Sequence, residues 1–118
     1  MKKNTHRSGQ VAETVRQVLG EALVHEIRDP RVGRVTITAV TVTPDLSRAK
    51  VRFITGEGDD SAKAMEGLRS AAGFLRTKVA KVLTTRIAPE IAFELDRGQE
   101  HAARIDQLLA SLREGDEA

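Results

Sequence analysis

Three stretches of the chain carry apolar residues at intervals of three and four positions, which is the period of an amphipathic helix. The first extends from Val11 to Ile27 and is followed by Asp29-Pro30, where proline prevents the helix from continuing. The second extends from Met65 to Val82 and must stop before Pro89, and the third extends from Ala102 to Leu112. We therefore predict three helices.

Segments that alternate apolar and polar residues predict strands between the first two helices. Val35–Ala39 alternates, and Val40–Thr43 alternates with its phase shifted by one, which predicts a β-bulge near Ala39. Ala49–Phe53 alternates again after Thr43-Pro44-Asp45-Leu46-Ser47, a segment with the composition of a tight turn. The two strands and the turn predict a β-hairpin.

Ile91–Asp96 predicts a third strand, so the expected order is helix, strand, strand, helix, strand, helix. With 118 residues, 40% of them hydrophobic, the chain is long enough to close one core. We expect an α+β fold, in which helices pack on one face of a three-stranded sheet. It should form a single domain over residues 1–118, with an ordered core at about residues 8–112. Asp59 and Asp60 are suited to cap the second helix.

The distribution of charge is more informative than its total. The net charge is only +2, but residues 1–56 hold ten basic and five acidic side chains, and residues 94–118 hold seven acidic side chains against three arginines. This predicts a basic side and an acidic end. The basic start, with Lys2, Lys3 and Arg7, is either a mobile arm that orders on RNA or a disordered terminus.

Composition and motifs exclude several classes of protein. With no cysteine, disulfides and thiolate metal sites are excluded, and without an apolar signal core or membrane span we expect a soluble cytoplasmic protein. His6, His25 and His101 lie far apart outside any catalytic or metal-binding motif, and no phosphate-binding glycine loop occurs. Aromatic residues make up only 3%, so stacking of bases on aromatic rings is not the expected mode. We expect no enzyme, cofactor, metal or small-molecule substrate.

The second predicted helix is basic and contains a glycine. An ordinary soluble helix mixes charges of both signs, so a run without acids favours contact with phosphate over a merely solvated face. Gly73 costs about 1 kcal/mol relative to alanine, and with Ala71 and Ala72 it predicts a kink. The kink would serve a close crossing against another element, a direct contact with phosphate, or both. Between Gly67 and Pro89 there is no Asp or Glu, while five cations occur, namely Arg69, Arg76, Lys78, Lys81 and Arg86.

Further cations outside this helix could join the same surface. Lys50 and Arg52 lie on the polar face of the second predicted strand, with Arg48 before them, where they either contact phosphate or discourage edge pairing. Arg31 and Arg34 follow the Asp29-Pro30 loop. The residues predicted to bind RNA are Arg31, Arg34, Lys50, Arg52, Arg69, Arg76, Lys78, Lys81 and Arg86.

Four segments occur in a specific order: Arg31–Val40, Val42–Ser47, Ala71–Arg76 and Arg86–Ile91. Together they closely resemble the bacterial ribosome-binding factor A family, over about residues 8–112. The resemblance implies a type II KH-like domain in which an Ala-x-Gly kink, here Ala71, Ala72 and Gly73, replaces the Gly-x-x-Gly loop between two helices. The sequence contains no Gly-x-x-Gly, so we expect recognition of charge and shape rather than of single-stranded sequence.

Membership would further imply a non-enzymatic cytoplasmic assembly factor that binds the free small (30S) ribosomal subunit. Such factors assist late maturation and processing of 16S rRNA and often support growth in the cold. The expected partners are the small subunit and its rRNA, with no membrane, and the protein is expected to be a monomer. Two alternatives remain: a KH-like module for another RNA, and an adaptor whose acidic C-terminal helix docks on ribosomal proteins.

Overall fold

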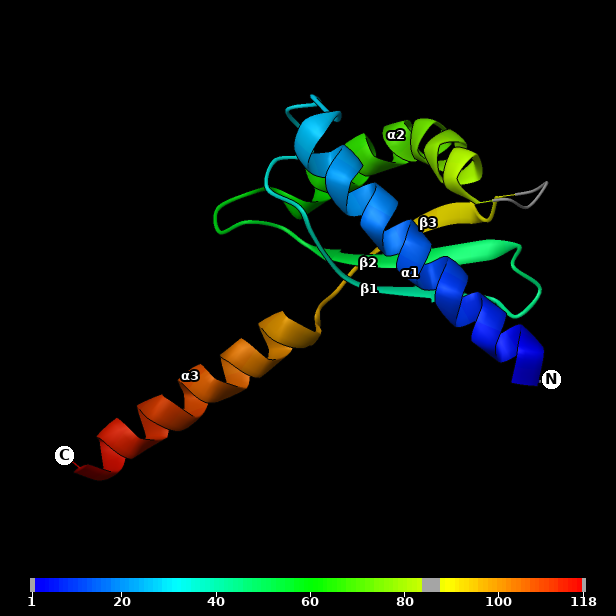
Figure 1. Cartoon of the computed structure of the whole chain (residues 1–118). Coiled ribbons are helices and arrows are strands. Elements are labelled where there is room, and N and C mark those ends of the chain that lie inside the picture. Colours follow the sequence, from blue (N-terminus) through cyan, green and yellow to red (C-terminus); the bar gives the residue numbers. More distant parts are fainter. Residues whose placement is uncertain (1, 84–87, 118) are drawn as a thin grey trace.

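The computed structural model of the chain describes residues 2–83 and 88–117, and in residues 2–6, 99–104 and 114–117 it defines the backbone alone. The described elements follow the predicted order (Figure 1). They are α1 (Lys2–His25), β1 (Thr36–Val42), β2 (Arg48–Ile54), α2 (Ser61–Val82), β3 (Glu90–Leu95) and α3 (Gly98–Glu117).

The strands form a mixed sheet in the order β1-β2-β3. β1 and β2 pair antiparallel, which confirms the hairpin, and β3 lies parallel to β2. The register between β1 and β2 shifts between Ile37 and Ala39, so the predicted bulge is confirmed. Because a parallel pair needs a long crossover connection, α2 has to lie over the sheet between β2 and β3.

The hairpin turn is held by its own polar side chains. The Leu46 N–H donates to the Thr43 carbonyl at 2.8 Å, which places Pro44 where its fixed φ favours the turn. The Asp45 carboxylate accepts from the hydroxyls of Thr43 and Ser47, both at 2.7 Å, and from the Ser47 N–H at 3.1 Å. These hydrogen bonds lower the pKa of Asp45 to about 2.

The core lies between one face of the sheet and the two helices α1 and α2 (Figure 1). The Phe53 ring of β2 is fully buried and meets the Phe93 ring of β3 edge-on, with centroids 6.3 Å apart. Each such side chain stabilises the fold by roughly 1.5–3 kcal/mol through burial. The largest fully buried apolar side chains also include Val15 and Leu19 of α1, Val51 of β2, and Leu68, Leu75 and Val79 of α2.

α2 begins where the sequence predicts a cap. The Asp60 carboxylate accepts from the N–H groups of Ala62 at 2.9 Å and Lys63 at 3.2 Å, which satisfies two of the free donors of the first turn. The capping prediction is therefore confirmed for Asp60. Asp59 instead accepts from the Arg34 N–H at 3.2 Å and orders the loop before the helix.

A glycine on α2 other than Gly73 brings two segments close together. Gly67 is buried, and a Cβ there would lie 2.8 Å from Cγ2 of Val32 and 3.3 Å from the Val32 backbone nitrogen. A Cβ at Gly73 would meet nothing within 4 Å. The close crossing considered for Gly73 is therefore wrong, and Gly67 supplies it, because only glycine lets the Arg31-Val32 backbone approach α2 this far.

Both ends of the chain differ from expectation. α3 makes no substantial contact with another element and extends away from the sheet, so only α1 and α2 satisfy the prediction that helices pack on its face (Figure 1). Its apolar residues have no partner surface within the described structure. At the other end α1 begins at Lys2, so the basic start, predicted as a mobile arm or a disordered terminus, is the first part of a helix.

Candidate nucleic-acid interface

The cations of α2 lie on two opposite flanks of the helix. Because Leu68, Leu75 and Val79 face the core, residues seven apart such as Arg69 and Arg76 share the flank beside β3. Lys78 and Lys81 lie on the flank beside α1, where they line a groove of about 250 Å³ with Glu21 and Glu26. Arg86 lies outside the described residues. The structure therefore divides the set that the sequence grouped on one helix.

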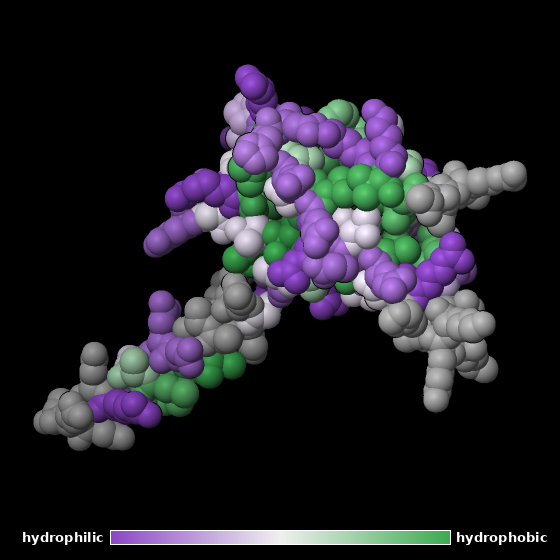
Figure 2. All heavy atoms as spheres, viewed as in Figure 1, coloured by the Kyte–Doolittle hydropathy of each residue, from purple (hydrophilic) through white to green (hydrophobic). Residues whose placement is uncertain are grey.

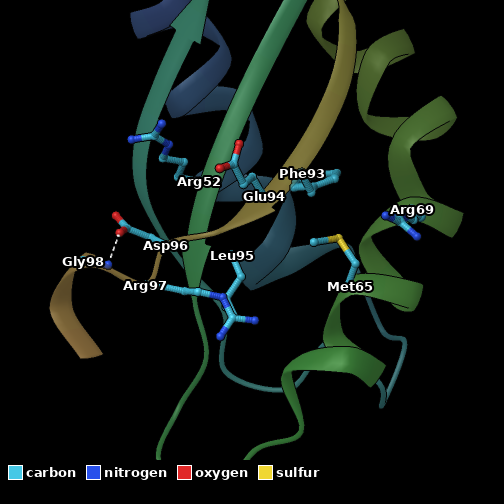
Figure 3. A pocket seen from close by; sticks show the side chains of 9 residues that line it. All are labelled: Arg52, Met65, Arg69, Phe93, Glu94, Leu95, Asp96, Arg97 and Gly98. Atoms are coloured by element: carbon cyan, nitrogen blue, oxygen red, sulfur yellow. Dashed lines mark hydrogen bonds between the residues drawn. The ribbon is translucent and has the colours of Figure 1, made fainter. Parts of the chain in front are cut away.

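Arg69 lies at a notch around the free edge of β3, where the chain leaves the sheet toward α3. The notch has a volume of about 660 Å³. Figure 3 shows Arg69 and Met65 extending from α2 on one side of β3, and Arg52 on the other side. Among the described residues, Arg52 and Arg69 form no ion pair within 4.0 Å, so both guanidinium groups are available to a ligand. The lining residues are Arg52, Met65, Arg69, Phe93, Glu94, Leu95, Asp96, Arg97 and Gly98.

The carboxylates of the notch are already engaged. Asp96 accepts from the Thr38 hydroxyl at 2.6 Å and from the Gly98 N–H at 2.9 Å. These two hydrogen bonds, with the nearby charge of Arg52, lower the pKa of Asp96 from its usual value. Glu94 lies 3.5 Å from the Lys50 ammonium on the outer face of the sheet. Three arginines thus face a notch whose two carboxylates have partners, which favours an anionic ligand such as phosphate.

Arg76 has a structural role, because its guanidinium group donates hydrogen bonds to the backbone. Its Nε and Nη2 donate to the Ala88 carbonyl at 3.2 and 3.1 Å, which fixes the chain just before β3. Ala88 is only 5% exposed, so its carbonyl depends on a protein donor. The RNA contact expected of Arg76 stays a prediction, but this structural role is shown.

Two of the cations predicted to bind RNA are already paired with carboxylates. Lys78 pairs with Glu26, the residue directly after α1, and also lies over the Phe74 ring, 5.6 Å from its centroid. Arg31 donates from Nη2 to Asp29 at 2.6 Å and to the Ser70 hydroxyl at 3.2 Å, and its hydrogen bonds to Asp29 lower the pKa of that carboxyl. The unopposed charge inferred for α2 was therefore wrong at Lys78, because its acid comes from a segment distant in sequence.

The remaining predicted cations are more exposed. The Arg34 guanidinium lies 3.6 Å from Asp59 and donates to the Glu57 carbonyl at 2.8 Å, which ties it to the loop before α2. Lys50 and Arg52 lie on the outer face of β2, as predicted. Lys81 makes no ion pair with any described residue. The cations without an ion-pair partner in the described structure are thus Arg52, Arg69, Arg76 and Lys81 of the predicted set.

The environment of Gly73 fits a bend open to solvent. α2 is helical throughout, so the prediction that Gly73 lies inside a helix is confirmed. The ribbon of α2 changes direction along its length (Figure 1). The Thr77 hydroxyl donates to the Gly73 carbonyl at 3.0 Å, a side-chain hydrogen bond that favours bending. Gly73 is exposed, so an approaching ligand can reach its backbone.

Sequence reasoning missed three residues. Arg97 completes the notch, and its position directly after a predicted strand end was a usable signal. Gly67 makes the close approach to Val32, which no local pattern reveals. Arg48 was noted only as leading into a strand, although it is the first residue of β2 and exposed on its outer face.

Comparison with known proteins identifies the family. A family model described as "Ribosome-binding factor A" matches residues 7–109. This chain belongs to the ribosome-binding factor A family. The ribosome-binding factor A of Rhodopirellula baltica is 41% identical over 113 residues, which cover 94% of this chain and 82% of that protein. The family is one of ribosome-binding factors and not of enzymes.

Solved structures of this family share the fold. The crystal structure of ribosome-binding factor A from Thermus thermophilus matches with a TM-score of 0.67 at 22% identity, covering 77% of this chain and 98% of that one. A homology model of the T. thermophilus protein, fitted into the cryo-EM map of a 30S–RbfA complex, matches with a TM-score of 0.59 at 24% identity, over 74% of this chain and 92% of that one. The α+β fold is therefore the expected KH-like fold.

Within residues 2–83 and 88–117, no group of three His, Asp or Glu side chains is placed to hold a metal ion. None of the helices described is both long and apolar enough to cross a bilayer.

Proposed function

We propose that this protein binds the free small ribosomal subunit through its rRNA and assists late maturation of the subunit, including processing of 16S rRNA. The observation that carries the proposal is the notch beside β3 in a chain of the ribosome-binding factor A family. It presents Arg52, Arg69 and Arg97 while its carboxylates have protein partners. The T. thermophilus member is described in complex with 30S, which supports the same class of partner here.

The proposed mechanism is electrostatic and geometric. Arginines of the notch neutralise phosphates of the immature rRNA, and the exposed bend at Gly73 lets an RNA backbone approach α2 closely. Lys81 adds charge on the other flank, and Arg86 remains a predicted contact. Binding holds one arrangement of the rRNA while other segments of the subunit mature.

The test is co-sedimentation of the full chain with free small subunits at 50 and 200 mM salt. A protein that makes about six phosphate contacts should lose on the order of a thousandfold in affinity over this range. The double charge reversal R69E/R97E should weaken binding at least tenfold, whereas R16E/R113E, the same change at exposed arginines of α1 and α3, should leave it nearly unchanged. Salt-independent binding, or equal effects of both variants, would refute the proposed interface.

The assembly role is tested in cells. Depletion of the protein should cause unprocessed 16S rRNA to accumulate together with free small subunits, most strongly in the cold. The wild-type chain should reverse the defect and R69E/R97E should not. Normal processing after depletion would contradict a role in maturation while leaving subunit binding intact.

One observation supports a second candidate, an adaptor that docks on ribosomal proteins through α3. Ile105, Leu108, Leu109 and Leu112 share one face of α3 and are 45–61% exposed, and Figure 2 shows apolar spheres on this isolated helix. Such a stripe is typical of a helix that enters an apolar groove. Nuclease treatment separates the candidates, because docking on protein alone survives removal of the RNA.

A further inference from the structure

The outer face of the sheet, opposite α1 and α2, carries a straight row of cations. Arg48, Lys50 and Arg52 are exposed on β2, while the alternate residues Ala49, Val51 and Phe53 are 0% exposed. Residues two apart on a strand are about 6.6 Å apart, at about 3.3 Å per residue. The row thus has a spacing of the same order as that between successive phosphates of an RNA strand.

Small side chains flank the middle of this row. Lys50 is paired across the sheet with Thr41 of β1 and Ala92 of β3. Arg52 lies between Ala39 of β1 and Glu94 of β3, and Arg48 lies beside Glu90 of β3. The three cations line a groove of about 430 Å³ together with Thr41 and Ala92. Because α1 and α2 pack on the opposite face and α3 extends away, no described element covers the groove.

The cations of this outer face lie on the central strand and its acids at the β3 edge. β1 contains no charged residue, and Glu90 and Glu94 of β3 lie in register with Arg48 and Arg52. Asp96, just after β3, is engaged by the Thr38 hydroxyl. Glu94 pairs with Lys50 at 3.5 Å, with both side chains about half exposed. Arg48 and Arg52 form no ion pair within 4.0 Å with the described residues, so two arginines remain for an external anion.

The composition of the groove favours an RNA backbone over a protein surface or unstacked bases. Its lining contains no aromatic side chain, so bases have no ring to stack on. Protein interfaces are depleted in charge at their centre and enriched in large aromatic residues, which is the opposite of this row. Guanidinium groups bind phosphate oxygens in bidentate fashion, and Arg48 and Arg52 frame the row at both ends.

The groove and the notch share a residue. Arg52 lines both, so the two surfaces meet at the C-terminal end of the free edge strand β3. We propose that the RNA-binding surface continues from α2 around this edge onto the outer face of the sheet, where Arg48, Lys50 and Arg52 hold successive phosphates of the same RNA. The inference rests on the proposed function and assigns Arg48, together with the outer face, to that interface.

The test separates the two parts of the surface with matched double variants. R48Q/K50Q removes two cations of the groove, R69Q/R97Q removes two of the notch, and R16Q/R113Q removes two charges elsewhere. K50Q also releases Glu94, which lines the notch, so R48Q alone is measured beside the double variant. Affinity for free small subunits and for deproteinised 16S rRNA is measured between 50 and 200 mM salt. Thermal unfolding of each variant shows that the fold is retained.

Loss of two phosphate contacts should reduce the slope of log affinity against log salt by about 1.4–1.8. Raising the salt from 50 to 200 mM should therefore weaken the binding of R48Q/K50Q by a factor about ten times smaller than for the wild type, with both ligands. R16Q/R113Q should respond to salt as the wild type does. A wild-type slope for R48Q/K50Q would overturn the inference and leave the notch intact. A change seen with subunits but not with bare rRNA would assign the face to a ribosomal protein and overturn it too. Failure of the wild type to bind either ligand would instead refute the proposed function.

Discussion

Two glycines of α2 lie in opposite environments, so the same substitution should have opposite effects on stability. Replacing glycine by alanine inside a helix stabilises it by up to about 1 kcal/mol, because alanine loses less backbone entropy on folding. At Gly73 the new Cβ would meet nothing within 4 Å. We therefore expect G73A to gain most of this amount.

At Gly67 the new methyl group has no room. Its Cβ would lie 2.8 Å from Cγ2 of Val32, a side chain that is 3% exposed, and 3.3 Å from the Val32 backbone nitrogen. Neither a buried side chain nor a backbone atom can retreat cheaply, and overpacking of this kind costs about 1–3 kcal/mol. After subtraction of the helical gain, we expect G67A to lose up to about 2 kcal/mol.

Thermal unfolding monitored by circular dichroism measures both variants. At about 2.1 cal/mol/K per residue, 1 kcal/mol corresponds to about 4 °C for a chain of this length. G73A should unfold up to about 4 °C higher than the wild type, and G67A as much as 8 °C lower. Equal shifts of the same sign would refute the assignment of the close approach to Gly67.

The same variants test how Gly73 contributes to RNA binding. If an RNA backbone approaches this exposed turn, G73A should bind small subunits more weakly although its fold is more stable. The bulkier G73V should weaken subunit binding more than it weakens the fold. Unchanged subunit affinity in both variants would remove Gly73 from the interface.

Three further predictions follow from single contacts. The pKa of Asp45 is about 2 in the folded state, against an ordinary 3.8. Its contribution to stability is therefore present above pH 4 and is lost as the pH falls through about 2. Over this range the free energy of unfolding of D45N in urea should depend less on pH than that of the wild type. R76M leaves the buried Ala88 carbonyl without its donor and should lower the free energy of unfolding in urea by about 1–3 kcal/mol. R69M, which breaks no hydrogen bond or ion pair within the described structure, should stay within about 0.5 kcal/mol of the wild type. Equal losses would contradict the different roles assigned to these arginines. D60A removes the cap of α2 and should cost about 1 kcal/mol, and an unchanged unfolding midpoint would show that water replaces the carboxylate.

Local patterns were sufficient for the elements of this fold. The phase change between Val35–Ala39 and Val40–Thr43 located the bulge of β1, and Asp60 marked the start of α2, because both features depend on neighbours within a few residues. The alternation of Ala49–Phe53 also placed Lys50 and Arg52 on the outer face of β2. Recognition of the family rested on short motifs of the same local kind.

The chemistry of each cation was decided by tertiary structure. The sequence shows no acid between Gly67 and Pro89, yet Lys78 pairs with Glu26, directly after α1. Arg31 pairs with Asp29 and also contacts α2 through the Ser70 hydroxyl. Arg76 donates to the Ala88 carbonyl instead of remaining free.

Sequence patterns alone identify this chain as a KH-like α+β protein of a ribosome-binding family with a basic second helix. The folded arrangement was needed to show which cations are available, that Gly67 rather than Gly73 makes the close crossing, and that α3 has no partner surface within the described fold. The difference comes from the range of the interactions. Helical and strand periods are set by the backbone over a few residues, whereas an ion pair, a steric contact or a covered face depends on segments that are distant in the chain and meet only in the folded molecule.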